Sequence, residues 1–197
     1  MYKQYKLGWI EVITGCMFAG KTEELIKRIR VLEYAKKNIH VFKPSIDDRY
    51  SIDKISSHAG SHYQSFVLSD DLSPITKLIN DPKVDVVVID EVQFFDESIV
   101  DICEQLANNK KRVIVAGLDT DFRGEPFPII SALMAKAEFV TKLSAVCSVC
   151  GAPATRTQRL INGKPAHYND PIILVGAHEC YEARCRGCHC VCKDENK

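Results

Sequence analysis

A segment near the start of the chain has the residue types and spacing of a phosphate-binding loop. Gly15 and Gly20 allow a tight turn, so that backbone N–H groups and the positive end of a following helix face one anion. Lys21 can then reach the outer phosphates of a nucleotide, and the hydroxyl of Thr22 can ligate magnesium. The cofactor-binding candidates of this loop are Gly15, Cys16, Met17, Phe18, Ala19, Gly20, Lys21 and Thr22.

The flanking residues disfavour the alternative, a glycine turn with a purely structural role. Residues 9–14 are rich in β-branched side chains and predict a strand. Beyond Thr22, Leu25, Ile29 and Leu32 recur at helical spacing and predict an amphipathic helix. A strand, a glycine loop and a helix in this order form the context in which the pattern binds phosphates.

Two adjacent acids provide a second set of chemical groups. Residues 84–89 are almost continuously apolar and predict a strand buried on both faces, which Asp90 and Glu91 follow. Ligands bind at the carboxyl ends of parallel strands, so Asp90 is predicted to help hold magnesium rather than to cap a helix or lie on the surface. Glu91 could accept the proton of an attacking hydroxyl or orient a water in an ATPase, and the residues alone leave both roles open.

Paired cysteines predict a metal site. Cys147 and Cys150 form one Cys-x-x-Cys pair, and Cys185 and Cys188 form another. Four thiolates of this spacing are typical of a closed structural zinc site, and free thiols are the alternative. We expect no secretory signal, and in such a chain paired cysteines are better explained by metal binding than by disulfides. The residues leave open which groups of the second cluster bind, since others lie close by: Cys180, His189, Cys190 and Cys192.

The rest of the sequence alternates strand-like and helix-like segments, which predicts a parallel α/β sheet from residue 8 to about 144. Residues 44–65 are polar with little periodicity and predict a loop. The expected strands are 9–14, 38–43, 84–89 and 112–118, and the expected helices are the segment after Thr22, one from Ser73 to about Asp81, one near 99–106 and 129–137.

The segment after residue 144 differs in character. It contains the cysteine pairs, a turn at Asn162-Gly163 and one strand-like run at 172–175. We therefore predict an ATP-binding α/β domain of phosphate-loop type over residues 1–144, a small zinc-binding lasso domain over 145–192 and a polar tail over 193–197.

Composition narrows the class of protein. The 197 residues include 26 Lys and Arg against 26 Asp and Glu, so the net charge is zero and no basic surplus points to nucleic acid. No apolar run approaches the roughly 18 residues that a membrane helix requires. We expect a soluble, cytoplasmic protein with no nucleic-acid or membrane partner.

Several motifs together resemble the cytosolic-type (type II) thymidine kinases. The resemblance spans nearly the whole chain, and the motifs occur in the family's order. They are residues 15–22, Asp90-Glu91-Val92-Gln93-Phe94-Phe95, Gly117-Leu118-Asp119, Phe122-Arg123-Gly124-Glu125-Pro126-Phe127, Ala154-Thr155-Arg156-Thr157-Gln158-Arg159, and Tyr181 with Cys185-Arg186-Gly187-Cys188.

The resemblance implies ATP-dependent phosphorylation of the thymidine 5′-hydroxyl, with deoxyuridine as a possible second acceptor. Glu91 would be the general base, ATP and Mg²⁺ would bind at the loop with Asp90, Gln93 would lie beside the nucleotide, and Arg49 would help to cover the phosphates. A structural Zn²⁺, a homotetramer and feedback inhibition by dTTP are also implied. The implied thymidine-binding residues are Met17, Phe122, Thr157, Ile172, Ile173, Leu174, Val175, Gly176 and Tyr181.

Other interpretations remain for individual residues and for the whole chain. Phe122 could be a core residue, Arg49 a solvated charge and Tyr181 a packing residue of the small domain. A nucleic-acid-binding ATPase with a zinc ribbon is the second functional hypothesis, which the neutral charge disfavours. A nucleotide switch without chemistry would leave Glu91 and the segment around Phe122 without a role.

Overall fold

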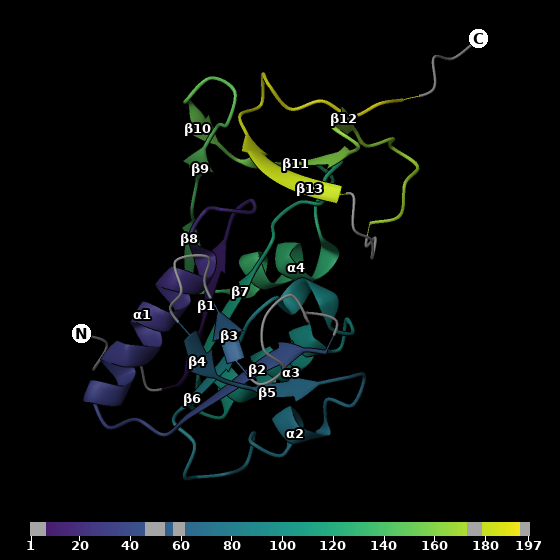
Figure 1. Cartoon of the computed structure of the whole chain (residues 1–197). Coiled ribbons are helices and arrows are strands. Elements are labelled where there is room, and N and C mark those ends of the chain that lie inside the picture. The colour runs from purple at the N-terminus through teal and green to yellow at the C-terminus, as the bar shows by residue number, and fades with distance from the viewer. Residues whose placement is uncertain (1–6, 46–53, 57–61, 173–178, 194–197) are drawn as a thin grey trace.

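The computed structural model describes residues 7–45, 54–56, 62–172 and 179–193, and Figure 1 shows their arrangement. Six strands form one sheet in the order β5-β2-β6-β7-β1-β8, and every pair in it is parallel. The predicted parallel α/β fold is therefore confirmed. The strands are β1 (Trp9–Thr14), β2 (Ile39–Pro44), β5 (Phe66–Leu68), β6 (Val86–Ile89), β7 (Arg112–Gly117) and β8 (Phe139–Lys142).

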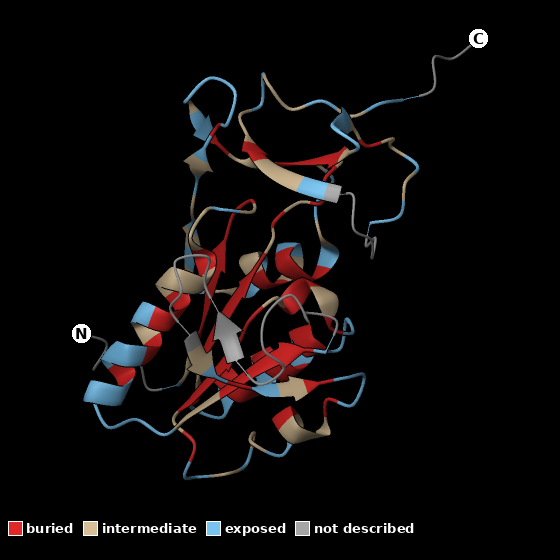
Figure 2. Cartoon of the chain, viewed as in Figure 1, coloured by how far each residue is buried: buried red, intermediate tan, exposed pale blue. Residues whose placement is uncertain are grey.

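Helices cover both faces of this sheet. Successive residues of a strand point to opposite faces. In β7, Ile114 therefore packs with α1 (Lys21–Tyr34), whereas Val113 packs with α3 (Ile99–Asn108) and α4 (Pro128–Lys136). Figure 2 shows the buried residues concentrated in the central strands and on the helix sides that face them. Each large aliphatic side chain buried there contributes about 1.5–3 kcal/mol relative to exposure.

Two sequence expectations are wrong in detail. The polar segment 44–65, expected to be a loop, contains the antiparallel strands β3 (Lys54–Ser56) and β4 (His62–Gln64), which are too short and polar to produce a hydrophobic pattern. The helix expected from Ser73 to about Asp81 is α-helical only over α2 (Ser73–Thr76). It continues as turns whose N–H groups bond three residues back, such as Ile79 to Thr76 at 3.2 Å.

A smaller C-terminal lobe follows β8 and lies at one end of the sheet (Figure 1). The turn predicted at Asn162-Gly163 joins β11 to β12, and the positive φ values of 50° and 76° explain these residue types. The lobe contains the antiparallel pair β9 (Ala145–Val146) and β10 (Pro153–Ala154), and a sheet of β11 (Arg156–Ile161), β12 (Lys164–Pro165) and β13 (Glu179–Arg184).

The strand expected at residues 172–175 lies outside the described residues except for Ile172, which is 43% exposed and not in a strand. A short 3-10 helix, η1 (Val92–Phe94), follows β6. Among the residues that the structure describes, no helix has the length and apolar character needed to cross a membrane.

Candidate active site

The loop between β1 and α1 needs glycine at both predicted positions. At Gly15 a Cβ atom would lie 2.4 Å from the carbonyl oxygen of Leu143, just after β8, and φ is 145°. At Gly20 there is space, but φ is 80°, a conformation that side chains disfavour. The loop therefore makes the tight backbone turn that phosphate binding requires. Close packing excludes a side chain at Gly15, and the left-handed backbone disfavours one at Gly20.

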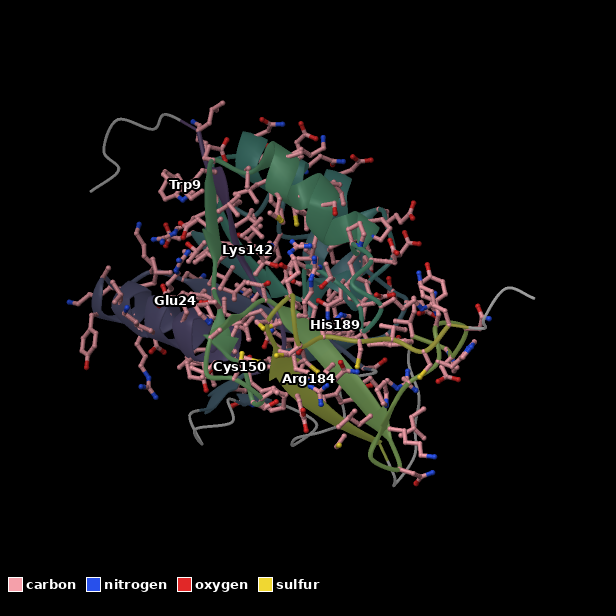
Figure 3. All side chains as sticks on the ribbon, turned by 90° about the horizontal axis from the view of Figure 1, so that it is seen from above. Trp9, Glu24, Lys142, Cys150, Arg184 and His189 are labelled. Atoms are coloured by element: carbon pink, nitrogen blue, oxygen red, sulfur yellow. The ribbon has the colours of Figure 1, made fainter. Side chains whose placement is uncertain are left out.

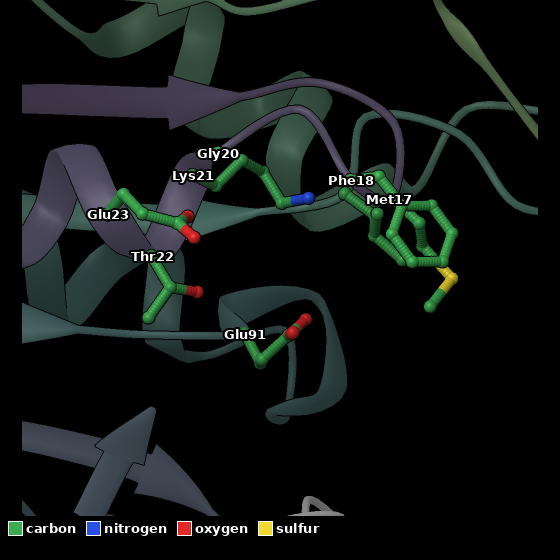
Figure 4. Close-up of a pocket in the computed structure, with 8 residues that line it drawn as sticks. Met17, Phe18, Gly20, Lys21, Thr22, Glu23 and Glu91 are labelled. Carbon is green, nitrogen blue, oxygen red and sulfur yellow. The ribbon is translucent and has the colours of Figure 1, made fainter. Parts of the chain in front are cut away.

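The side chains of this loop and of Glu91 surround one cavity (Figure 4). Lys21 is 8% exposed, and its Nζ donates to the carbonyl oxygen of Cys16 at 2.9 Å, so the cation is held inside the loop. Figure 4 shows the polar ends of Lys21, Thr22 and Glu91 directed toward the same space. The cavity is lined by Met17, Phe18, Gly20, Lys21, Thr22, Glu23, Glu91 and Leu118.

Glu91 occupies a strained and well-supported position after β6. Its φ of 48° and ψ of 41° are left-handed values that a non-glycine residue rarely adopts. Its backbone N–H donates to Oδ1 of Asp90 at 3.0 Å, and its Oε2 accepts a hydrogen bond from Nε2 of Gln93 at 2.6 Å. Oε1 of Gln93 in turn accepts from the backbone N–H of Leu118 at 3.1 Å, so the end of β7 helps to fix the carboxylate.

Gly117 leaves the space that Gln93 occupies, which leads to a prediction. A Cβ at residue 117 would lie 2.3 Å from Oε1 of Gln93 and 2.9 Å from Cδ1 of Ile130. We expect Gly117→Ala to displace the Gln93 amide, release Glu91 and lower kcat roughly ten- to a hundredfold. Steady-state kinetics measure this, and in a Gln93→Ala background the same change should have little further effect. Additive effects of the two substitutions would contradict the proposed contact chain.

The C-terminal lobe contacts the phosphate loop directly. The backbone N–H of Met17 donates to Oγ1 of Thr157 on β11 at 3.1 Å, and Thr157 is only 3% exposed. Sγ of Cys16, which is fully buried, donates to the carbonyl oxygen of Ala154 at 3.4 Å, and burial raises the pKa of this thiol. Cys16 is therefore a packing residue whose contribution to an anion site is its backbone.

Phe122 is buried under two arginines rather than open to the cavity. It is 4% exposed, and the guanidinium carbons of Arg159 and Arg123 lie 5.0 and 5.4 Å from the centre of its ring. Arg159 donates to the carbonyl oxygen of Pro171 at 2.5 Å, and Arg123 to that of Asp170 at 2.8 Å. The two cations thus join the Phe122 ring to the residues that precede the implied thymidine-binding segment.

The four paired cysteines converge on one point. The sulfur atoms of Cys147, Cys150, Cys185 and Cys188 all lie within 4.8 Å of one another, and those of Cys150 and Cys185 are 3.7 Å apart. Four sulfurs at about 2.3 Å from a tetrahedral zinc ion are about 3.8 Å apart, so the donor set fits this metal. A hydrogen bond from the backbone N–H of Cys185 lowers the pKa of Cys147 to about 6, which favours a thiolate ligand.

The neighbouring groups lie outside this cluster. Sγ of Cys192 donates to the carbonyl oxygen of Pro165 at 3.4 Å, and the thiol of Cys190 lies 3.9 Å from a nitrogen of Arg184. Cys180 is exposed on β13, and Nε2 of His189 contacts the carbonyl oxygen of Phe122. Within the described ranges, only the four paired cysteines form a metal-binding group.

The structure brings some predicted residues together and leaves others apart. The cavity is lined by Met17, Lys21, Thr22 and Glu91. Asp90 and Gln93 are hydrogen-bonded to Glu91, and Thr157 is hydrogen-bonded to Met17. Tyr181 is half-buried on β13, opposite Arg159 on β11. The candidates outside the described residues are Arg49, Ile173, Leu174, Val175 and Gly176.

Sequence reasoning missed several residues of the site. Glu23 lines the cavity, and its place in the first turn of the helix after the phosphate loop could have indicated this. Leu118 lines it because it follows the end of β7, next to β6 and β1 in the sheet. The contacts of Arg159 and His189 with Phe122 had no signal in the sequence, since they join segments far apart in the chain.

Comparison with known proteins adds evidence of descent. The model of the thymidine kinase family matches residues 8–189. A thymidine kinase of Mycoplasma capricolum subsp. capricolum is 58% identical over 190 residues, which cover 95% of this chain and 91% of that protein.

Two solved structures show more distant similarity. The genome packaging NTPase B204 of Sulfolobus turreted icosahedral virus 2 gives a TM-score of 0.44 at 18% identity, covering 73% of this chain and 76% of the viral one. A single-residue variant of RuvB from Thermotoga maritima gives 0.39 at 13% identity, covering 70% of this chain and 38% of RuvB. At these TM-scores neither similarity carries an argument about the fold. The family match over residues 8–189 and the identity to the Mycoplasma protein show that this chain belongs to the thymidine kinase family.

Proposed function

We propose that this chain transfers the γ-phosphoryl group of ATP to the 5′-hydroxyl of thymidine, with Glu91 as the general base. Membership of the thymidine kinase family supports the reaction, its two substrates and the need for a divalent metal. The observation that supports the residue roles is the cavity in which Lys21, Thr22 and Glu91 face one another. Thymidine monophosphate and ADP are the products.

The phosphate loop supplies the binding site for the donor. Backbone N–H groups after Gly15 and the first turn of α1 favour the negative charge of the phosphates. Lys21 exchanges its contact with the Cys16 carbonyl for the outer phosphates, and it stabilises the charge that develops during transfer. Thr22 and Asp90 would hold Mg²⁺, which screens the phosphate charges when bound; their oxygen donors suit this ion.

Glu91 acts on the acceptor. As the 5′-oxygen of thymidine bonds to the γ-phosphorus, its proton passes to the Glu91 carboxylate, and the bond to the bridging oxygen of ADP breaks. Gln93 donates to Oε2 of Glu91, and this bond fixes the orientation of the carboxylate that would accept the proton. Because Gln93 is itself held by Leu118, the carboxylate is positioned before thymidine arrives.

The thymidine base binds between the phosphate loop and the C-terminal lobe in this proposal. Met17 lines the cavity, and its backbone bond to Thr157 supports a role for both residues beside the base. Phe122 also contributes to the base site in this proposal, from a position where its ring is buried against Arg123 and Arg159. Tyr181 and residues 172–176 complete the site in this proposal, and Arg49 covers the phosphates.

A zinc ion bound by the four paired cysteines would tie β9 to the end of β13. The spacing of the sulfur atoms supports this, and four thiolates leave no coordination position for chemistry. We also propose an ATP-binding domain over residues 1–144, a zinc-binding domain over 145–192 and a tail over 193–197. In support, β8 is the last strand of the large sheet and β9 the first of the lobe.

Further properties are proposed from membership of the family. They are a homotetrameric assembly, inhibition by dTTP, tolerance of deoxyuridine and a cytoplasmic location. The family match disfavours the alternative, a nucleic-acid-binding ATPase with a zinc ribbon. The net charge of zero also disfavours it.

A panel of nucleosides tests the reaction. Purified protein with magnesium ATP should convert thymidine to its monophosphate and release one ADP per product, as measured by chromatography. Thymidine that stays unmodified while DNA stimulates ATP hydrolysis would favour the alternative. Adenosine and guanosine provide the negative controls.

A further inference from the structure

The acceptor loop, residues 119–127, connects β7 to α4 and is internally rigid. Oδ1 of Asp121 accepts hydrogen bonds from the backbone N–H groups of Arg123 at 2.8 Å and Glu125 at 3.0 Å. Gly124 has a φ of 84°, which lets the loop reverse direction. These bonds hold residues 121–125 in one turn, so a contact with a residue of this turn acts on the turn as a unit.

His189 makes such a contact from the C-terminal lobe. Its Nε2 lies 2.8 Å from the carbonyl oxygen of Phe122. A carbonyl oxygen can only accept, so Nε2 must carry the hydrogen. The acceptor loop is thus held by a residue directly after Cys188, and Figure 3 shows His189 in the view down onto this lobe.

The backbone that carries His189 is fixed on both sides. Its N–H donates to the carbonyl oxygen of Cys185 at 3.0 Å, within the second cysteine pair. The backbone of the next residue, Cys190, makes two hydrogen bonds with the side-chain amide of Gln158. The N–H of Cys190 donates to Oε1 of Gln158 at 2.9 Å, and Nε2 of Gln158 donates to the carbonyl oxygen of Cys190 at 2.8 Å. Gln158 is only 1% exposed, so these two bonds are shielded from water.

The same strand holds the phosphate loop. Gln158 follows Thr157 on β11, and Thr157 accepts the bond from the N–H of Met17. One strand therefore supports the donor loop through Thr157 and the acceptor loop through Gln158 and His189. We infer that His189 is a positioning residue for thymidine: it places the acceptor loop relative to the phosphate loop and links that placement to the paired-cysteine site.

This inference rests on the proposed function of the acceptor loop, and three substitutions test it. His189→Phe keeps a ring but removes the donor, and His189→Asn has a donor too short to reach. His189→Gln places an amide nitrogen near the position of Nε2. We expect the first two to weaken thymidine binding about three- to tenfold, as for one lost hydrogen bond, and His189→Gln to restore it.

Three measurements distinguish a role of His189 in placing the acceptor loop from a role in zinc retention and from a loss of folding that affects both substrates. Calorimetric titration gives the thymidine Kd, steady-state kinetics give KM for ATP, and elemental analysis gives zinc per chain. The KM for ATP should stay within about twofold, with zinc unchanged. Cys190→Ser is the matched control, because its exposed thiol lies outside the cluster and the cavity.

Each other outcome overturns the inference. Zinc lost from His189→Phe or His189→Asn would make His189 a residue for metal retention, and equal changes for both substrates would indicate general damage. Thymidine affinity unchanged in both variants, while the unsubstituted chain binds thymidine, would remove His189 from the site. If the unsubstituted chain binds no thymidine, the proposed function itself fails.

Discussion

Glu91→Gln should bind ATP with an affinity within about twofold of the unsubstituted chain and lose about a hundred- to ten-thousandfold in kcat. The amide has nearly the shape of the carboxylate but cannot accept the proton of the 5′-hydroxyl. The oxygen of the introduced amide can still accept from Nε2 of Gln93, and Oε1 of Gln93 keeps its bond from Leu118, so the strained loop after β6 is retained. ATP titration and steady-state kinetics with thymidine measure the two effects.

Glu97→Gln is the matched control for this experiment. Glu97 is exposed just before α3 and lies outside the cavity lining, and its substitution removes the same charge. Its kcat should stay within about twofold of the original. Near-normal turnover in Glu91→Gln would exclude the carboxylate as the base and leave the phosphate loop as the main source of catalysis.

Cys185→Ser should reduce zinc from one ion per chain to nearly none and abolish most thymidine phosphorylation. The buried apolar cluster where the C-terminal lobe meets the phosphate loop consists of the small side chains of Cys16, Cys147, Ala154 and Ala183. Such small side chains bury little apolar surface and contribute little to the free energy of unfolding. Small domains of this kind are usually stabilised by a bound metal or by disulfides. Structural zinc sites contribute about 10 kcal/mol or more in isolated zinc-finger peptides.

Elemental analysis, thermal unfolding and ATP titration distinguish the effects of Cys185→Ser. We expect a lower Tm and lost thymidine binding while ATP binding persists, because the large sheet has its own core on both faces. Cys190→Ser should keep its zinc and its activity. Full zinc retention in Cys185→Ser would refute the site of four thiolates.

The sequence predicted the features that depend on local pattern. The phosphate loop was predictable because its glycines, Lys21 and Thr22 form one short contiguous pattern, and the paired cysteines were predictable because Cys-x-x-Cys spacing is short-range. The apolar runs of β6 and β7 predicted buried parallel strands for the same reason. The family resemblance carried by these motifs is confirmed by the family match.

Features that depend on distant contacts were not predictable. β8 pairs with β1 across more than a hundred residues of sequence, and the carbonyl of Leu143, which follows β8, is what confines Gly15. The packing of Phe122 against Arg159 likewise depends on β11, a strand of the other lobe. The hydrophobic pattern of one segment gives no information about its contacts with a distant segment. In the sequence, each of the two contacting residues looks like an ordinary polar or aromatic residue.

The left-handed backbone at Glu91 has a consequence for how this position tolerates change. In non-glycine residues this conformation costs about 1–2 kcal/mol, and glycine or asparagine adopts it more readily. A selection for stability alone would thus favour the loss of the carboxylate, whereas a selection for turnover would keep it. With the proposed role of Glu91 as the base, the two pressures are opposed at this residue, and turnover is then retained at the expense of stability.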